Sequence, residues 1–149
     1  MTLVIGIGNA DRGDDAAGLA VARAIRAAGP RAAVAELAGD QLGLLDTWAG
    51  ADEVIVVDAV CSGARPGTVF RFSADTPLGG PFRRPGTHTF SLADVIELAR
   101  NLGVLPPRLS GYGIEGRNFG FGEPLSPSVS AAVREVANRL LADIIQGGG

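Results

Sequence analysis

Two aspartates and the single histidine of this chain have the chemistry to bind a metal ion together. Asp15 follows a short apolar run, Asp58 lies at the end of a Val/Ile-rich stretch, and His88 precedes a helical pattern. One imidazole and two carboxylates suit a borderline divalent cation. A structural zinc site would instead have four ligands, mostly Cys and His. The three residues therefore predict a partial metal site that ligands from a partner can complete.

Each of the three residues also has an ordinary structural explanation. An acid at a helix start, such as Asp15, interacts favourably with the helix dipole. Asp58 can cap the turn that follows it, although an acid ending a buried strand needs a partner because an unpaired buried charge is costly. A lone histidine in a loop, such as His88, is often only solvated. The combination indicates a site more strongly than any one member does.

The glycines near the N-terminus do not fit a nucleotide site. Gly6 and Gly8 follow a predicted strand, but the third glycine of a dinucleotide fingerprint is displaced, and Asp14 and Asp15 open the next helix. A helix N-terminus attracts phosphate, whereas two carboxylates there repel it and suit a cation. Asp14 is the expected N-cap of that helix.

Strands that alternate with helices must position these residues. We predict strands at residues 3–8, 32–37, 53–60 and 108–114, and a half-buried or edge strand at 68–72. Helices are predicted at 14–29, 42–48, 91–102 and 128–145, and Ser91 with Asp94 resembles a capping box. This order predicts a single domain over residues 1–149, a three-layer α/β/α sandwich with a twisted, mostly parallel sheet of about five strands. Ligands of such sheets bind beyond the carboxyl ends of the strands.

Composition excludes several classes of function. The 149 residues are 46% hydrophobic and 19% charged, as in a folded domain, and the net charge of −3 gives no case for nucleic acid or an anionic membrane. No apolar run approaches the roughly 20 residues that span a bilayer, and we expect no signal peptide. Cys61 is the sole cysteine, which fits a reducing cytoplasm. We expect it to be a small packed thiol rather than a nucleophile.

Several separated motifs, in order and over nearly the whole chain, resemble the maturation endopeptidases of nickel–iron hydrogenases. They are Gly6-Ile7-Gly8-Asn9 with Gly13-Asp14-Asp15, Val57-Asp58-Ala59-Val60, His88 with Ser91-Leu92-Ala93-Asp94, Tyr112-Gly113-Ile114-Glu115, and Leu125-Ser126-Pro127. The resemblance implies a hydrolase, classified by family as aspartic-type, that removes the C-terminal extension of a [NiFe] hydrogenase large-subunit precursor after nickel insertion. We therefore expect a cytoplasmic protein without membrane insertion.

The resemblance also implies roles for individual residues. Asp15, Asp58 and His88 match the three metal ligands of the family, in which the nickel belongs to the substrate and serves for recognition. Some relatives have Glu where this chain has Asp15. The segment 36–41 departs from the D-G-G-T form of other relatives, so no catalytic role passes to Glu36 or Asp40.

The residues leave the chemistry of hydrolysis open. Water activated by the metal is one route, and a carboxylate acid–base pair is another. A Ser-His-Asp triad is disfavoured because the one histidine would have to serve twice and no G-x-S-x-G motif is present. Segments 76–86 and 116–122 are either walls of a substrate groove or ordinary surface loops.

Three other functions are compatible with parts of this pattern. A non-enzymatic nickel-binding chaperone of the same fold would use the same ligands. A small nucleotide- or ligand-binding α/β module would bind phosphate at Gly6–Gly13. A general peptidase with a permanent metal would cleave unrelated peptides.

Overall fold

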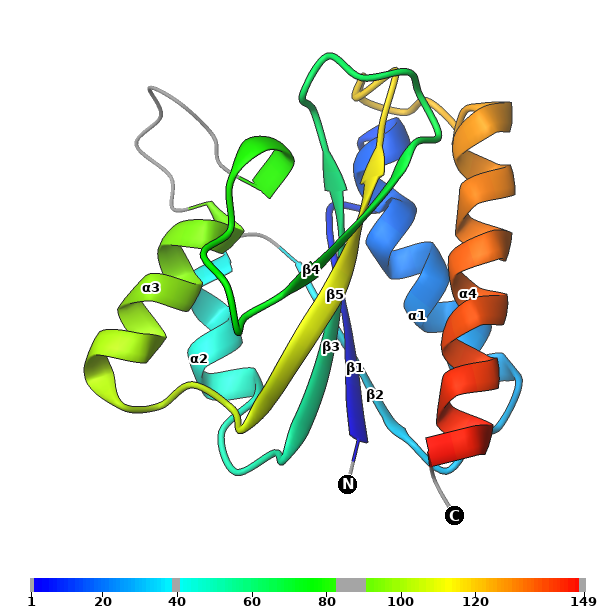
Figure 1. Cartoon of the computed structure of the whole chain (residues 1–149). Helices are drawn as coiled ribbons and strands as arrows, with labels where there is room; N and C mark the ends of the chain where they lie inside the picture. The colour runs from blue at the N-terminus through cyan, green and yellow to red at the C-terminus, as the bar shows by residue number, and fades with distance from the viewer. Residues whose placement is uncertain (1, 39–40, 83–90, 148–149) are drawn as a thin grey trace.

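One five-stranded sheet organises the protein, and a computed structural model describes residues 2–38, 41–82 and 91–147 of it. The strands are β1 (Thr2–Ile7), β2 (Ala33–Leu37), β3 (Glu53–Val60), β4 (Val69–Ser73) and β5 (Arg108–Glu115), in the order β2-β1-β3-β5-β4. Four strands run parallel, and β4 pairs antiparallel with β5 at one edge (Figure 1). The predicted mostly parallel sheet and its edge strand are confirmed.

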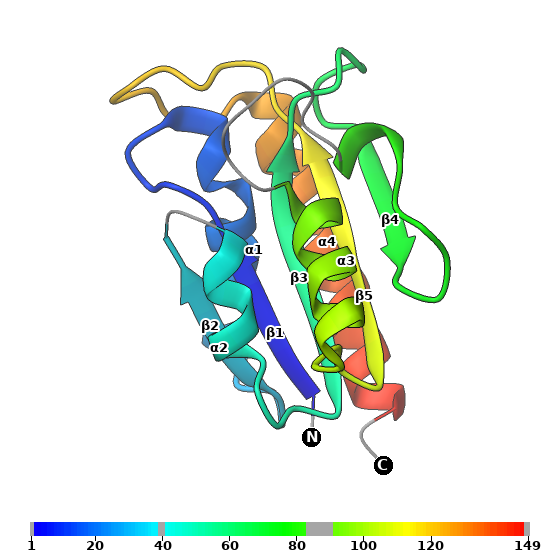
Figure 2. The ribbon, with the colours of Figure 1, turned by 90° about the vertical axis from the view of Figure 1, so that its left-hand side faces the viewer.

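Helices cover both faces of the sheet and complete the predicted three layers. Helices α1 (Ala17–Ala27) and α4 (Pro127–Gly147) lie on one face, and α2 (Leu44–Thr47) and α3 (Leu92–Leu102) lie on the other (Figure 2). Three short 3-10 turns, η1 (Gly13–Ala16), η2 (Gln41–Gly43) and η3 (Gly80–Phe82), lie in the connections. Within the described residues, none of the helices combines the length and apolarity that crossing a membrane requires.

Strand β3 contributes to both cores because its side chains alternate between the faces. Val54 and Val56 pack into the core beneath α2 and α3, together with Trp48. Val57 packs into the core beneath α1 and α4. By this alternation Asp58 belongs to the α2–α3 face, which matters for the site below.

Glycines allow α1 to lie against the sheet at very short range. A Cβ atom on Gly18 would sit 2.3 Å from the carbonyl oxygen of Val57 and 2.4 Å from that of Ile7, and one on Gly6 would sit 2.2 Å from that of Gly18. A side chain at either position would therefore push the helix off the sheet. Close packing explains these glycines without a phosphate ligand.

Local signals at α3 behave as predicted. Ser91 is its N-cap, and the Ser91 and Asp94 side chains form a reciprocal capping box with the two backbone N–H groups. Gly103 ends the helix in the left-handed conformation that glycine tolerates best, with φ of +74°.

The short helix expected at 42–48 is present as one continuous helical stretch, in which η2 leads directly into α2. The prediction was wrong by one residue at the end of β5, because Glu115, which the predicted strand 108–114 leaves out, is its last residue. The described part of the expected loop 76–86 has no strand or α-helix, but it buries Leu78 and Phe82, so it is partly core.

Candidate functional site

Asp58 is buried near the carboxyl end of β3, with 5% of its surface exposed. It pairs in register with Gly113 of β5. The amide Nε2 of Gln41 donates a hydrogen bond to its Oδ2 at 3.0 Å. Strand alternation thus directs a charged group into an interior position, where a buried amide stabilises it.

Asp15 lies in η1, directly beyond the carboxyl end of β1, and is partly exposed. Its Oδ2 accepts a hydrogen bond from the backbone N–H of Asn9 at 3.0 Å. The backbone is close here, since a Cβ on Gly8 would sit 2.0 Å from the Asp15 carbonyl oxygen. Because η1 contacts β3, both aspartates lie at the carboxyl edge of the sheet.

The third predicted ligand, His88, and Asp40 lie outside the described residues. Among the residues that are described, no group of three or more His, Cys, Asp or Glu side chains could hold a metal ion. Two carboxylates of the predicted trio therefore lie at one edge of the sheet, and the metal role of the trio stays a prediction.

Asp14, the neighbour of Asp15, is not the predicted N-cap. It acts as a latch, by which we mean a buried carboxylate that holds the 117–126 loop through hydrogen bonds. It is fully buried, and its carboxylate accepts hydrogen bonds from the backbone N–H groups of Arg117, Asn118 and Ser126 and from the Ser126 hydroxyl, at 2.7–2.9 Å. No side chain caps η1 or α1. The carboxylate instead satisfies donors of the 117–126 loop, whose own backbone has few local partners.

Two opposing effects set the pKa of Asp14. Burial alone would raise it, but the N–H groups of Asn118 and Ser126, the Ser126 hydroxyl and the N–H of Arg117 together lower the pKa of Asp14 below its ordinary value. The group is therefore ionised in the folded protein at neutral pH.

A third buried carboxylate, Glu115, holds the turn after β3. Its Oε2 accepts the backbone N–H of Ser62 at 2.9 Å, and its Oε1 accepts the Ser62 hydroxyl at 2.5 Å. Glu115 is 2% exposed and pairs with Val60 in the sheet. It therefore fixes the chain two residues beyond the end of β3.

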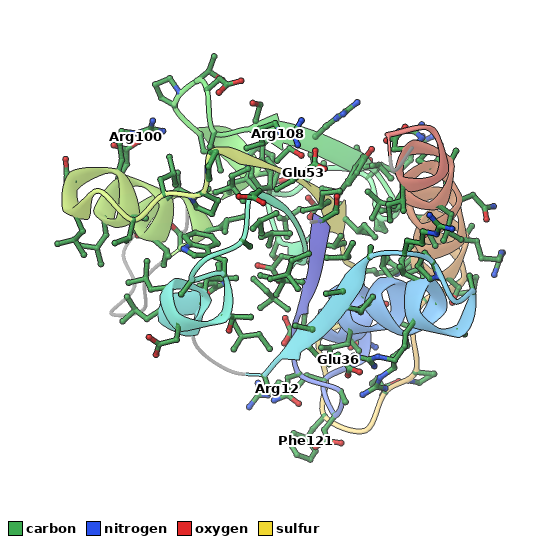
Figure 3. All side chains as sticks on the ribbon, turned by 90° about the horizontal axis from the view of Figure 1, so that it is seen from below. Arg12, Glu36, Glu53, Arg100, Arg108 and Phe121 are labelled. Carbon is green, nitrogen blue, oxygen red and sulfur yellow. The ribbon has the colours of Figure 1, made fainter. Side chains whose placement is uncertain are left out.

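Glu36 has a structural role at the surface. It accepts hydrogen bonds from Arg23 at 3.0 Å and from Arg26 at 2.5 Å, both on α1 (Figure 3 shows its position). The hydrogen bond from Arg26 makes the largest contribution to lowering the pKa of Glu36, and the hydrogen bond from Arg23 lowers it further. These contacts give Glu36 a structural explanation, and its absence from the catalytic set stays a prediction.

Cys61 is exposed, which contradicts the expected packed thiol. It follows β3 directly and, with Ser62, Gly63 and Ala64, lines a shallow depression of about 590 Å³ whose other side is Phe70, Gly80 and Pro81. Gly80 and Pro81, from the segment 76–86, therefore form one side of this depression, and its role as a substrate groove stays a prediction. Residues 116–122 do not line this depression, because Asp14 holds part of that loop elsewhere.

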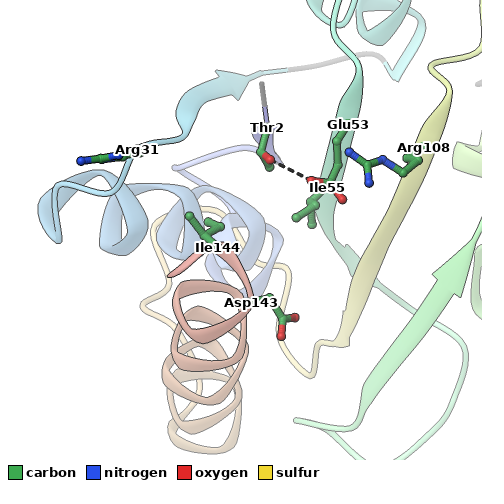
Figure 4. Close-up of a pocket in the computed structure, with 7 residues that line it drawn as sticks. All are labelled: Thr2, Arg31, Glu53, Ile55, Arg108, Asp143 and Ile144. Carbon is green, nitrogen blue, oxygen red and sulfur yellow. Dashed lines mark hydrogen bonds between the residues drawn. The ribbon is translucent and has the colours of Figure 1, made fainter. Parts of the chain in front are cut away.

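Another cavity lies at the opposite end of the sheet. Thr2, Glu53 and Arg108, the first residues of β1, β3 and β5, line a volume of about 150 Å³ together with Arg31, Ile55, Asp143 and Ile144 (Figure 4). Within it the Thr2 hydroxyl donates to Glu53 at 2.8 Å. Its position at the amino ends of the strands separates it from Asp15 and Asp58.

Sequence reasoning missed Gln41 and the latch role of Asp14. The only signals available for them were their places inside or beside quoted segments: Gln41 closes the divergent 36–41 segment, and Asp14 stands within Gly13-Asp14-Asp15. Neither signal names a partner, because the partners are 17 and 112 residues away.

The fold and the acidic carboxyl edge define the protein as a three-layer α/β sandwich with a candidate ligand site at the ends of its parallel strands. The sequence profile described as "Hydrogenase maturation protease" matches residues 31–143. This chain therefore belongs to the hydrogenase maturation protease family, whose members are endopeptidases, and the family implies a hydrogenase large subunit as substrate. No protein of curated function matches the sequence.

Solved structures agree with this assignment. The hydrogenase maturating endopeptidase HybD from E. coli is 25% identical, with a TM-score of 0.81 over 99% of this chain and 93% of that one. An endopeptidase from Escherichia coli is 28% identical, with a TM-score of 0.78 and the same coverage. The [NiFe] hydrogenase maturation protease HycI from Thermococcus kodakarensis, at 22% identity, shares the fold with a TM-score of 0.76 over 96% of this chain and 91% of its own.

Proposed function

We propose that this protein removes the C-terminal extension of a nickel-loaded [NiFe] hydrogenase large-subunit precursor, and that it recognises the nickel through Asp15, Asp58 and His88. The observation that carries the proposal is the placement of Asp15 and Asp58, from η1 and β3, at one carboxyl edge of the sheet in a chain of this family. Ligands bind at this edge in open α/β sheets.

The chemistry of the ligand set favours a metal that arrives with the substrate. Two carboxylates and one imidazole leave coordination positions of a divalent ion unfilled. Ligands of the precursor would fill them, so a nickel-free precursor would bind poorly. This requirement would delay cleavage until the metal centre of the hydrogenase is assembled.

Binding of the nickel would place the scissile peptide beside the end of β3, which supplies proximity and orientation. The depression between residues 61–64 and 80–81 would then hold the extension. The attacking water would be activated either by the bound metal or by one of the carboxylates. The residues of the enzyme would bind and orient the substrate in both cases.

The test is cleavage of nickel-loaded and nickel-free precursor by the wild-type protein and by His88→Ala, Asp58→Asn and Glu36→Gln variants. We expect wild type to cleave only the loaded precursor, and His88→Ala and Asp58→Asn to lose that cleavage. Glu36→Gln is the matched control, because that acid is bound by Arg23 and Arg26 of α1 and is not one of the three proposed ligands.

Three results would contradict the proposal in different ways. Tight nickel binding with no cleavage of either precursor would indicate a chaperone. Cleavage of unrelated peptides with a stoichiometric resident metal would indicate a general peptidase. Full cleavage by both site variants would show that these residues do not recognise the nickel.

A further inference from the structure

The hydrogen bond between Gln41 and Asp58 links two buried side chains from different elements. Gln41 is the first residue of η2, in the connection from β2 to α2, and is 7% exposed. Asp58 lies on β3 and is 5% exposed. A hydrogen bond from a buried amide to a buried carboxylate is strong, because little water competes for either group.

Packing holds Gln41 in place independently of Asp58. The turn that Gln41 opens continues into α2, whose Leu44 and the following Trp48 are fully or almost fully buried in the core beneath α2 and α3. The Thr47 hydroxyl donates to the Gly43 carbonyl at 2.8 Å and closes the same turn. The amide donor is therefore presented to Asp58 by a turn that is anchored in this core.

We infer that Gln41 is a positioning residue that orients the carboxylate of Asp58 for the substrate's metal. The inference rests on the function proposed above. An ionised carboxylate offers about four acceptor sites, so a bond from Gln41 to Oδ2 is compatible with metal binding by the same group. Outer partners of this kind commonly fix the orientation of metal ligands.

The chemistry at position 41 follows from this role. The neutral amide donates a hydrogen bond without adding charge, whereas a glutamate would place a second carboxylate against Asp58. A leucine would keep most of the volume but leave Asp58 without this donor. Position 41 therefore requires a donor that reaches Oδ2, and not merely a side chain that fills space.

The first test compares Gln41→Leu with Thr47→Val in cleavage of nickel-loaded precursor. Both variants remove a hydrogen bond from the same connection, but only Gln41 contacts Asp58. We expect kcat/KM to fall about 10- to 100-fold for Gln41→Leu and to stay at the wild-type value for Thr47→Val. Gln41→Asn is measured in parallel, because it keeps the amide but shortens its reach. It should also lower kcat/KM, and it keeps the test decisive if Gln41→Leu does not fold.

The second test is spectroscopic and does not depend on activity. In a ¹H–¹⁵N correlation spectrum, the side-chain amide signals of Gln41 should move in Asp58→Asn and stay in place in Ser73→Ala, a distant surface change. A merely space-filling Gln41 would show no such selective shift.

The outcomes separate this inference from the proposed function. Wild-type cleavage by Gln41→Leu, or Gln41 signals unmoved by Asp58→Asn, would overturn the positioning role. The proposed function would still stand in that case, provided that Asp58→Asn abolishes cleavage. Full cleavage by Asp58→Asn would instead overturn the proposed function of the site.

Discussion

The carboxylate of Asp14 binds Ser126 twice, through the backbone N–H at 2.7 Å and through the hydroxyl at 2.7 Å. These residues belong to Gly13-Asp14-Asp15 and Leu125-Ser126-Pro127, two of the motifs that the family resemblance singles out. A similar contact joins Glu115, in the Tyr112-Gly113-Ile114-Glu115 motif, to Ser62 after β3. Two of the motifs therefore contain buried carboxylates that hold loops at the carboxyl edge, beside the candidate ligands.

Replacing Asp14 by Ala should destabilise the protein by about 3 kcal/mol or more, because charged hydrogen bonds are lost and buried donors of the 117–126 loop are left unpaired. Urea unfolding measures the change. Asp11→Ala, an exposed acid in the same segment, should stay within about 0.5 kcal/mol of wild type. Equal stability of Asp14→Ala and wild type would show that the latch contributes nothing.

Acid should remove the stabilisation that Asp14 provides. The folded pKa lies below the ordinary value of 3.8, so the contribution is fully present above that value and is lost as pH falls through the folded pKa. The difference in unfolding free energy between wild type and Asp14→Asn should be constant from about pH 7 to pH 5 and shrink below about pH 4. A difference that grows in acid would contradict the lowered pKa.

Substituting Gly18 by Ala should cost about 1–3 kcal/mol, because the new methyl group would collide with backbone carbonyls of β1 and β3. Thermal or urea unfolding measures the loss. Gly79→Ala is the matched control, since nothing lies within 4 Å of a Cβ there and its backbone needs no glycine. Similar effects of the two substitutions would indicate that α1 can move away from the sheet without cost.

Changing Glu115 to Gln should loosen the turn after β3, because the new NH₂ group would face donors of Ser62. We expect a loss of about 1–3 kcal/mol and faster hydrogen exchange at the Ser62 backbone amide. The amide of Val56, in the centre of β3, serves as an internal reference for global opening. Unchanged exchange at Ser62 would mean that Glu115 does not hold this turn.

The Cys61 thiol should not be needed for cleavage, but a bulky group attached to it should inhibit cleavage. Cys61→Ser should retain wild-type kcat/KM, because the proposed chemistry uses no thiolate. Alkylation of the exposed thiol should nevertheless inhibit the wild type by filling the depression that Cys61 lines, and should have no effect on Cys61→Ser. Loss of activity in Cys61→Ser would indicate a cysteine nucleophile instead.

Most of the fold could be predicted because it depends on local patterns. The Val54–Val57 run indicated a buried parallel strand, Thr68–Phe72 indicated an edge strand, and Ser91 with Asp94 indicated the start of α3. Each signal is a periodicity or a cap that involves residues close in the sequence. The order of the elements then limited the topology to an α/β sandwich.

By itself, the sequence determined the layers, the strand ends at which Asp15 and Asp58 lie, and the family. Only the tertiary structure decided the partners of the buried polar groups: Gln41 for Asp58, Ser126 for Asp14 and Ser62 for Glu115. It also decided that Cys61 is exposed and that Asp14 is a latch rather than a cap. The physical reason is that each of these hydrogen bonds joins residues 17 to 112 positions apart, so no local periodicity encodes the pair. Every buried charge needs a partner, but this requirement identifies the partner only once the chain is folded.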